Sequence, residues 1–303
     1  MNQNFYDKLN NVIAKDSILI DEPMSRHTTF RVGGPADFFV TPKAKEEVRD
    51  VVRICKEAGM PYYIIGNGSN LLVSDAGYRG VIVQIYKEMN EVKVEGDLVK
   101  AQAGALLSVI AAKALGAELS GFEFASGIPG TIGGACVMNA GAYGGEMKDV
   151  LESVTVLTGE GKIIELGRNE LELGYRTSVI AKKGYIVLGA VLKLERGDGE
   201  KIKTYMDELK EKRVTKQPLE YPSAGSTFKR PEGYFAGKLI QDSGLKGFTV
   251  GGAQVSEKHS GFVINKGNAT AADVMELIRQ VTAKVKEDTG VTMEPEVKQI
   301  GEF

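Results

Sequence analysis

The sequence has no tryptophan and contains only two cysteines and two histidines among its 303 residues. The histidines, His27 and His259, stand far apart with no cysteine beside them, so no zinc-binding spacing is present and we expect no metal site. Cys55 and Cys136 are too few for a disulfide scaffold, and we expect two free thiols in a reducing compartment. No Gly-x-Ser-x-Gly motif occurs, which argues against a serine hydrolase of that type.

Long apolar runs and a surplus of either charge are also missing. No run approaches the roughly 20 apolar residues that span a bilayer, and segment 1–16 lacks the apolar block of a signal peptide. A net charge of −2 shows no excess of basic residues that would bind nucleic acid or an anionic membrane. With 43% hydrophobic residues, we expect a soluble cytoplasmic protein of about two domains that acts on small molecules and is not inserted in a membrane.

Glycine is abundant, and two stretches, 66–72 and 127–145, are rich in it. Glycine is favoured where a Cβ would collide with a ligand, and consecutive main-chain N–H groups in such loops bind phosphate. We therefore interpret both stretches as ligand-binding loops, and we expect the glycines of 127–145 to have no packing purpose. Leu71 replaces the third glycine of a dinucleotide fingerprint, and Leu239 after Gly237-Lys238 does not fit a P-loop. The expected ligand contains phosphate, but its site is of another type.

The apolar periodicity predicts an α+β fold in which helices and short strands are interleaved. The clearest helices are 43–58, which Thr41-Pro42 is expected to cap, and one that begins at Thr270 and ends at Gly290. We expect two lobes, about 1–88 and 89–197, and a third segment at 198–303. We also predict a hairpin at 90–104, a helix at 106–115 and strands at 62–65, 81–85, 154–157, 162–165, 185–194 and 261–264. A linker at 196–199 is followed by a predicted helix to about 215, whose inward residues are Ile202, Tyr205, Met206 and Leu209.

Three polar residues occupy positions that packing does not explain well. Arg176 follows Gly174-Tyr175 in a break between strands, where a guanidinium could clamp a carboxylate. Ser226 lies in a predicted loop at 217–231 with two cations after it, where a serine could act as an acid. Glu296 lies in a predicted final strand and could act as an acid, a base or an electrostatic stabiliser. Each also has an ordinary interpretation: a surface arginine, a turn hydroxyl and an exposed edge glutamate.

Six motifs taken together, in this order, resemble the UDP-N-acetylenolpyruvoylglucosamine reductase (UDP-N-acetylmuramate dehydrogenase, MurB) family. The resemblance extends from about Ser25 to the end of the chain. Any one of the motifs alone would be weak evidence. They are Ile65-Gly66-Asn67-Gly68-Ser69-Asn70-Leu71-Leu72, Gly127-Ile128-Pro129-Gly130-Thr131-Ile132-Gly133-Gly134, Met138-Asn139-Ala140-Gly141-Ala142-Tyr143-Gly144, Tyr175-Arg176, Ala224-Gly225-Ser226-Thr227-Phe228-Lys229 and Glu294-Pro295-Glu296-Val297.

The resemblance implies a two-lobed FAD-binding module of the vanillyl-alcohol-oxidase (PCMH) type at 1–197 and a C-terminal α+β substrate-binding domain at 198–303. The glycine-rich loops would then form the cradle of the FAD pyrophosphate and the wall of the isoalloxazine pocket, with NADPH as co-substrate. The implied cofactor-binding residues are Ile65, Gly66, Asn67, Gly68, Ser69, Asn70, Leu71, Gly127, Ile128, Pro129, Gly130, Thr131, Gly133, Gly134 and Ala140.

By the same resemblance, the reaction reduces the enolpyruvyl ether of UDP-N-acetylglucosamine to UDP-N-acetylmuramate for cell-wall precursor synthesis. Hydride passes from NADPH to FAD and then from flavin N5 to C3 of the substrate. The resemblance assigns Arg176 and a protonated Glu296 to the substrate carboxylate, and Ser226 to protonation of C2. The implied substrate-binding residues are Tyr175, Arg176, Lys229 and Lys216.

Two features separate this sequence from other relatives. Arg230 stands where many relatives have asparagine, which affects the expected diphosphate contacts. Between Arg176 and Gly197 the chain has too few residues for the tyrosine-bearing loop of the longer form. The sequence therefore resembles the shorter form.

Two other functions stay open at this point. A different FAD-dependent oxidoreductase of the same fold would share the glycine-rich loops without needing Arg176, Ser226 and Glu296 together. A catalytically silent binder of flavin or nucleotide sugar would keep the loops and show no turnover. We expect non-covalent FAD, because no histidine or cysteine lies in the first loop, although Cys136 in the second leaves a covalent link open.

Overall fold

The computed structural model describes residues 3–303. Two compact units are present: the first contains 3–19, Phe38–Asn67 and Gly80–Arg213, and the second contains Ile20–Asp37, Gly68–Arg79 and Val214–Phe303. The chain therefore passes between the units several times, and the first glycine-rich loop is divided between them. None of the described helices is long and apolar enough to cross a bilayer.

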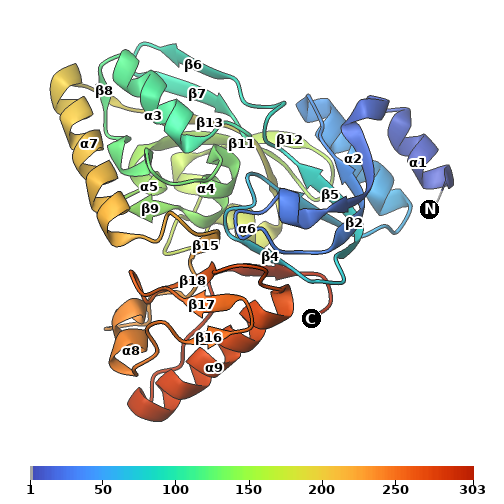
Figure 1. Ribbon diagram of the computed structural model, residues 1–303. Helices are drawn as coiled ribbons and strands as arrows, with labels where there is room; N and C mark the ends of the chain where they lie inside the picture. Colours follow the sequence, from blue (N-terminus) through green and yellow to red (C-terminus); the bar gives the residue numbers. More distant parts are fainter. Residues whose placement is uncertain (1–2) are drawn as a thin grey trace. The chain divides into compact units, whose positions relative to one another are not determined.

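Helices and strands alternate along the described chain, and most are labelled in Figure 1. The helices are α1 (Gln3–Asn10), α2 (Lys45–Glu57), α3 (Leu107–Gly116), α4 (Ile132–Met138), α5 (Met147–Val150), α6 (Val179–Lys183), α7 (Gly199–Lys216), α8 (Ala236–Asp242) and α9 (Ala271–Thr289), with 3-10 turns at Lys15–Ser17, Met24–Arg26, Glu123–Ala125 and Arg168–Glu170. The strands are β1 (Ile18–Pro23), β2 (Pro35–Val40), β3 (Tyr62–Ile65), β4 (Leu71–Val73), β5 (Tyr78–Gln84), β6 (Val92–Glu95), β7 (Leu98–Gln102), β8 (Leu119–Ser120), β9 (Gly141–Ala142), β10 (Gly145–Glu146), β11 (Leu151–Leu157), β12 (Ile163–Gly167), β13 (Ile186–Lys193), β14 (Glu195–Arg196), β15 (Ser223–Ser226), β16 (Thr249–Val250), β17 (Ala253–Val255), β18 (Phe262–Asn265) and β19 (Lys298–Ile300).

Helix α2 packs against strand β5 in the first unit. Val51 and Cys55 of α2 share a buried core with Val81 and Val83 of β5. β5 runs parallel to β3 in a four-stranded sheet of order β1-β2-β5-β3. The predicted inner face of α2 and its end before Gly59, whose φ is 61°, are confirmed.

The predicted cap of α2 is wrong. Thr41-Pro42 precede the helix, which begins at Lys45 after Ala44, and Ala44 makes no side-chain cap hydrogen bond. Instead, a Glu47 carboxylate oxygen accepts a hydrogen bond from the Lys43 N–H at 2.7 Å. An acidic side chain in the first turn thus supplies the acceptor that was expected from threonine.

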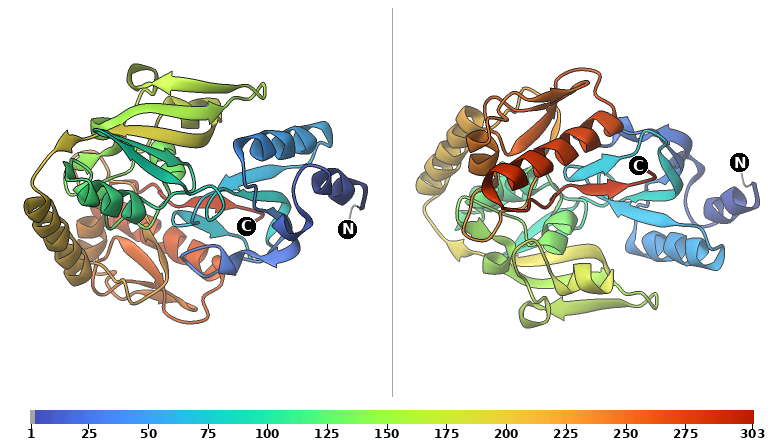
Figure 2. Two further views of the ribbon diagram at one scale, coloured as in Figure 1. Left: turned by 90° about the horizontal axis from the view of Figure 1, so that it is seen from above. Right: turned by 90° about the horizontal axis from the view of Figure 1, so that it is seen from below.

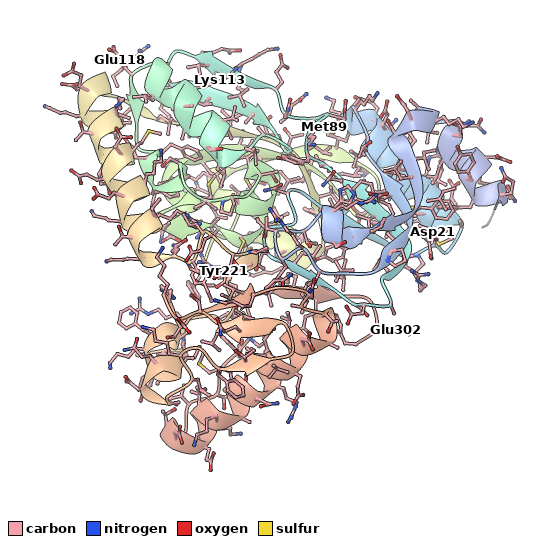
Figure 3. All side chains as sticks on the ribbon, in the orientation of Figure 1. Asp21, Met89, Lys113, Glu118, Tyr221 and Glu302 are labelled. Atoms are coloured by element: carbon pink, nitrogen blue, oxygen red, sulfur yellow. The ribbon has the colours of Figure 1, made fainter. Side chains whose placement is uncertain are left out.

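The larger sheet of the first unit is antiparallel and has the order β12-β11-β13-β7-β6. The predicted hairpin at 90–104 is confirmed, because Val94 pairs with Val99. The strands predicted at 154–157 and 162–165 also form, and they pair with each other through Val156 and Ile164. Helices α3 and α4 pack on this sheet through one continuous apolar core. Lys113 of α3, labelled in Figure 3, donates a hydrogen bond to the Val92 carbonyl of β6 at 2.8 Å.

Helix α7 follows the predicted linker directly, because β14 ends at Arg196 and α7 begins at Gly199. Ile202 and Leu209 are 4% and 3% exposed, as expected for its inner face. Tyr205 is 42% exposed, so its predicted inward position is wrong. Successive helix residues are about 100° apart, which places Tyr205 at the edge of the face that Ile202, Met206 and Leu209 define.

The second unit combines a four-stranded antiparallel sheet, of order β15-β18-β17-β16, with helices α8 and α9. Helix α9 packs along this sheet (Figure 2). Its predicted start is confirmed by a reciprocal capping box between Thr270 and Asp273, and its predicted end by Gly290, whose φ is 74°. Strand β19 runs parallel to β4 in a separate two-stranded sheet.

Two predictions about the second unit are wrong. Segment 217–231 was expected to be a loop, but residues 223–226 form β15, because they pair with the buried strand β18. The final strand was expected at 294–297, but β19 begins at Lys298. Pro295 has no N–H to donate, and it forms only an isolated bridge with Phe228.

The N-terminus of α9 depends on a side chain that is distant in sequence. Asp75 accepts hydrogen bonds from the N–H groups of Ala271 and Ala272 at 2.8 and 2.9 Å. We expect Asp75→Ala to lower the free energy of unfolding by about 1 kcal/mol, because the first turn of α9 loses its acceptor. Urea denaturation followed by far-UV circular dichroism measures this change.

The matched control is Asp207→Ala. Asp207 is an exposed residue of α7 that pairs with Lys203 at 3.0 Å. Surface pairs of this kind contribute about 0.3–0.5 kcal/mol, so the control should shift the transition less. Equal shifts in the two variants would contradict the role assigned to Asp75.

Candidate cofactor and substrate site

The two glycine-rich stretches meet in the first unit. A Cβ built on Gly66 would lie 2.3 Å from Thr131 Oγ1, so only glycine allows this approach. Asn67 Nδ2 donates a hydrogen bond to the Pro129 carbonyl at 2.7 Å, and Gln84 Nε2 donates one to the Gly66 carbonyl at 3.2 Å. Residues 65–67 and 129–131 are therefore neighbours, as expected if both stretches serve one ligand.

The main-chain N–H groups of the first stretch have no acceptor within the described chain. This holds for Gly66, Asn67, Gly68, Ser69 and Asn70, whereas the carbonyl groups of Gly68 and Asn70 accept hydrogen bonds from Thr29 and Lys298. In the second unit, a Cβ on Gly68 would lie 2.1 Å from the His27 carbonyl oxygen. Main-chain N–H groups without a partner are available to bind an anion.

The second stretch is less open than expected. Helix α4 occupies Ile132–Met138, and Thr131 Oγ1 accepts a hydrogen bond from the Gly134 N–H at 3.4 Å. The helix forms despite its glycines because Ile132, Ala135 and Cys136 are buried in the large core. Tertiary burial therefore outweighs the low helix propensity of glycine here.

Several glycines of the second stretch do have a packing role, so the expectation that they have none is wrong. A Cβ on Gly133 would lie 2.9 Å from the Ala103 carbonyl oxygen. A Cβ on Gly145 would lie 2.7 Å from the Phe124 ring. By contrast, the N–H groups of Gly127, Gly130 and Thr131 have no acceptor among the described residues. The N–H groups of this stretch that are open to a ligand thus lie at its beginning.

The remaining predicted cofactor residues support these two stretches. Ile65 ends β3 and Leu71 begins β4, and both are buried. The Ile128 N–H donates to the Ala125 carbonyl at 3.1 Å, and the Ala140 N–H donates to the Ala135 carbonyl at 2.9 Å. These four residues hold the loops in place through their main chains and apolar side chains.

Both cysteines are free and buried, as predicted. Burial raises the pKa of Cys55 to about 12 and raises the pKa of Cys136 further. Cys136 is therefore a neutral thiol at physiological pH. A thiol is a much weaker nucleophile than a thiolate, so this environment disfavours attack by Cys136 on a flavin.

Arg176 stands in a tight turn of the first unit. Gly174 and Thr177 exchange both main-chain hydrogen bonds, so Tyr175 and Arg176 form the tip of the turn. Arg176 has a φ of 54°, a left-handed conformation that costs a non-glycine residue about 1 kcal/mol or more. Its guanidinium carbon lies 5.2 Å from the centroid of the Tyr175 ring, which is 56% exposed.

Asn139 is a positioning residue that the sequence prediction did not include. Its Nδ2 donates to the Gly174 carbonyl at 3.1 Å, and its Oδ1 accepts from the Lys148 N–H at 2.9 Å. The side chain is buried, and the residue ends α4 with a φ of 45°. Asn139 therefore fixes the turn of Arg176 relative to α4. An asparagine directly after an expected helix end would have been the signal, but that helix was not predicted.

Ser226 and Glu296 lie on adjacent extended segments of the second unit. Ser226 is the exposed last residue of β15. The carbonyl of the next residue, Thr227, accepts a hydrogen bond from the Glu296 N–H at 2.7 Å. Thr227 Oγ1 accepts from the Val263 N–H at 2.9 Å, which holds this segment on β18. Asn70 Nδ2 donates to the Glu296 carbonyl at 3.3 Å, so part of the first loop also adjoins Glu296.

The predicted substrate cations are exposed or peripheral. Lys229 Nζ pairs with Glu294 Oε2 at 2.9 Å, and Lys216 is the exposed last residue of α7. The Arg230 guanidinium carbon lies 4.0 Å from the centroid of the Phe235 ring. The interaction with Phe235 holds Arg230 against its own loop.

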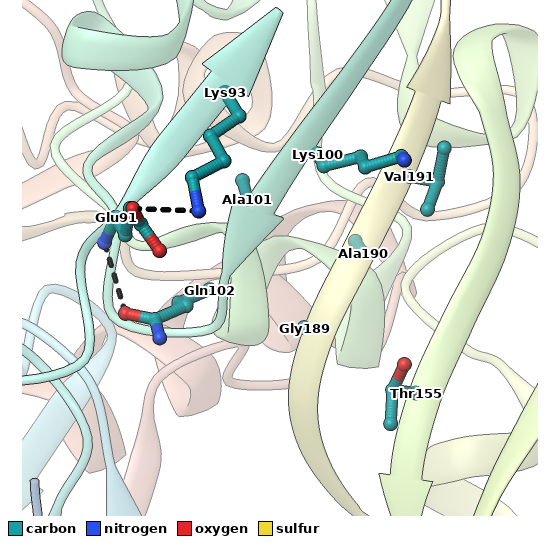
Figure 4. Close-up of a pocket in the computed structure, with 9 residues that line it drawn as sticks. All are labelled: Glu91, Lys93, Lys100, Ala101, Gln102, Thr155, Gly189, Ala190 and Val191. Carbon is teal, nitrogen blue, oxygen red and sulfur yellow. Dashed lines mark hydrogen bonds and ion pairs between the residues drawn. The ribbon is translucent and has the colours of Figure 1, made fainter. Parts of the chain in front are cut away.

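A hollow of about 250 Å³ lies on the larger sheet of the first unit (Figure 4). Glu91 pairs there with Lys93 at 2.9 Å, and the Glu91 N–H donates to Gln102 at 3.0 Å. None of the predicted site residues is among the nine residues that line it: Glu91, Lys93, Lys100, Ala101, Gln102, Thr155, Gly189, Ala190 and Val191.

Comparison with known proteins gives two family matches. Residues 36–167 match the FAD binding domain family, and residues 217–300 match the family described as UDP-N-acetylenolpyruvoylglucosamine reductase, C-terminal domain. The first match covers both glycine-rich stretches, and the second covers Ser226. Together they define a flavoprotein with a PCMH-type FAD-binding domain and a second α+β domain, which confirms the predicted fold class.

Full-length relatives identify the family. A UDP-N-acetylenolpyruvoylglucosamine reductase of Clostridioides difficile (strain 630) is 53% identical over 301 residues, which cover 99% of each chain. One of Clostridium perfringens (strain SM101 / Type A) is 55% identical over 303 residues, again 99% of each chain. The crystal structure of MurB from Thermus caldophilus has a TM-score of 0.80 and 37% identity, and covers 94% of this chain and 98% of that one.

The chain therefore belongs to the UDP-N-acetylenolpyruvoylglucosamine reductase (MurB) family. The resemblance given by the six motifs is confirmed. Membership of this family decides against an unrelated FAD-dependent oxidoreductase on the same fold.

The close approach at Gly66 makes FAD binding sensitive to one methyl group. We expect Gly66→Ala to weaken FAD binding at least about tenfold, because its Cβ must displace the buried Thr131 side chain that adjoins the loop. Titration of FAD into the apoprotein, followed by flavin fluorescence, measures the affinity.

Gly116→Ala is the control for this change. A Cβ there would meet no atom within 4 Å, so FAD affinity should equal that of the wild type. If Gly66→Ala binds FAD as tightly as this control does, the loop contact at Thr131 is not part of the cofactor site.

Proposed function

We propose that this chain catalyses the NADPH-dependent reduction of UDP-N-acetylglucosamine enolpyruvate to UDP-N-acetylmuramate, in the cytoplasm, for peptidoglycan precursor synthesis. The observation that carries the proposal is the run of main-chain N–H groups without an acceptor at 66–70, in a chain of this reductase family. Such a run suits a diphosphate, and FAD contains one.

The residues around this run fit FAD. Gly66 and Gly68 let the loop lie close to Thr131 and to the His27 carbonyl, and Gly127, Gly130 and Thr131 add N–H groups from the second stretch. Non-covalent binding fits the buried, neutral thiol of Cys136. The chemistry that FAD supplies when bound is the transfer of hydride from NADPH to C3 of the enolpyruvyl group.

The chain's own residues stabilise charge and deliver a proton. Hydride addition at C3 leaves negative charge at C2 and on the substrate carboxylate. In this proposal Arg176 and a protonated Glu296 bind that carboxylate, and the Ser226 hydroxyl gives its proton to C2. The exposed hydroxyl at the end of a paired strand and the turn held by Asn139 support these roles, because both side chains stand on main chain that is held by hydrogen bonds.

Lys229 and Lys216 are proposed to bind the UDP diphosphate of the substrate, and Tyr175 is proposed to contact the substrate beside Arg176. Lys229 would then exchange its exposed pair with Glu294 for a phosphate oxygen, an exchange that costs little because surface pairs are weak. We also propose the division into an FAD module at 1–197 and a substrate domain at 198–303. Between Arg176 and Gly197 the chain forms α6, β13 and β14, which supports assignment to the shorter form of the family.

The alternative of a silent binder is tested by turnover. Purified protein should carry FAD and oxidise NADPH only when the enolpyruvyl substrate is present. Binding of FAD and of the substrate without NADPH oxidation would favour the silent binder.

Replacement of Ser226 separates the two half-reactions. We expect Ser226→Ala to keep reduction of FAD by NADPH but to slow reduction of the substrate by about 10²- to 10⁴-fold, because only the second step needs its proton. Stopped-flow absorbance of the flavin measures both steps. Ser223→Ala, on the same strand, is the control and should slow neither; equal losses in both steps of Ser226→Ala would exclude Ser226 as the proton donor.

Replacement of Arg176 should also act on the second step. We expect Arg176→Ala to slow substrate reduction by about 10²- to 10³-fold, because the guanidinium no longer stabilises the negative charge on the substrate carboxylate. Arg176→Lys should recover part of the loss, since it keeps the charge without the planar fork.

Asn139→Ala tests the positioning of the same turn. It removes the hydrogen bond to the Gly174 carbonyl and should slow the second step by roughly tenfold, with FAD reduction unchanged.

Wild-type rates of substrate reduction in Arg176→Ala would contradict the role proposed for Arg176.

A further inference from the structure

The inner face of α7 ends in a charged residue. Ile202, Met206, Leu209 and Arg213 follow one another at spacings of four, three and four residues, which keeps them on one side of the helix. Ile202 and Leu209 are nearly fully buried, and Met206 packs on the same core. Arg213 thus occupies a position where the pattern calls for an apolar side chain.

The side chain of Arg213 lies against the beginning of the second glycine-rich stretch. A Cβ on Gly127 would be 3.0 Å from Arg213 Cδ and 3.7 Å from its Nε and Nη1. Both residues belong to the first unit. Glycine at 127 therefore leaves room for the guanidinium to lie along the loop that is proposed to face the cofactor.

No described residue forms a hydrogen bond or an ion pair with the Arg213 guanidinium. Among the arginines at 3–303, Arg31 is the other one without such a partner, and Arg31 is exposed. Burial lowers the pKa of Arg213, and the nearby Tyr143 opposes this change, but arginine stays cationic at physiological pH. A half-buried cation without a counter-ion is unfavourable, so this position is suited to an anion that arrives with a ligand.

We propose that Arg213 is a cofactor-contacting residue that stabilises the negative charge of the reduced isoalloxazine ring of FAD. The inference deepens the proposed function and rests on it. A hydride adds two electrons and one proton to the ring, so the reduced ring carries one more negative charge than the oxidised ring. A fixed guanidinium beside the ring favours the reduced state, which makes FAD easier to reduce with NADPH.

The test measures the reduction potential of FAD bound to the wild-type holoenzyme and to each variant, by equilibration with redox dyes. In Arg213→Gln, we expect the ratio of the affinities for reduced and oxidised FAD to fall at least tenfold, which makes the two-electron potential more negative by about 30 mV. Arg213→Lys keeps the charge and should shift the potential less. Gly127→Ala displaces the Arg213 stem and should shift it in the same direction as Arg213→Gln.

Lys212→Gln is the matched control. Lys212 is the preceding, exposed residue of α7, so this variant removes the same charge from the same helix and should leave the potential unchanged. An equal shift in Lys212→Gln would mean that only general charge matters, which overturns the proposal. Equal weakening of both FAD states in Arg213→Gln would assign the arginine to the pyrophosphate and would also overturn it, as would no change at all.

This measurement needs neither NADPH nor the enolpyruvyl substrate. If the wild type turns over the substrate and Arg213→Gln shows no shift, the inference about Arg213 fails and the proposed function stands. If the wild type binds FAD, shows the shift in Arg213→Gln and does not turn over the substrate, the proposed function fails and the role of Arg213 stands.

Discussion

The close packing of the two glycine-rich stretches, which a side chain at position 66 would prevent, is the constraint on which the first unit depends. Gly66 lies against Thr131, and Asn67 donates a hydrogen bond to the carbonyl of Pro129. The first contact needs glycine at position 66, and the second needs the side-chain amide of Asn67. Several carbonyl groups of these loops accept hydrogen bonds while many N–H groups have no acceptor, so the loops offer mainly N–H donors to a ligand. Phosphate is a natural ligand for such a surface.

Hydrogen bonds and apolar packing fix the positions of the charged groups. Arg176 is held in a strained turn by the buried amide of Asn139, and Arg213 is carried inward on the apolar face of α7. In the second unit, Thr227 joins the segments of Ser226 and Glu296 through its carbonyl group. The groups that we propose to act in the reaction therefore stand on hydrogen-bonded main chain, which would reduce the reorganisation needed during reaction.

Elements with a strong apolar period and clear end signals were predictable from the sequence. For α9, the cap at Thr270, the buried face and the end at Gly290 all point to the same helix. The errors fall where local preference and burial disagree. Helix α4 forms in a glycine-rich run because Ile132 and Cys136 are buried, and β15 forms in a polar segment because β18 offers it hydrogen bonds. Periodicity within a short window contains neither fact.

The sequence by itself determined the family, the glycine-rich loops, the free thiols and the three residues proposed for catalysis, because each depends on residue type and order along the chain. Tertiary structure decided which glycines pack against other residues, as Gly133 and Gly66 do, and which N–H groups have no acceptor among the described residues. It also decided that Asn139 supports Arg176 and that Arg213 has no counter-ion among the described residues. Those properties depend on segments that are distant in sequence, and only the folded chain brings such segments within hydrogen-bonding distance.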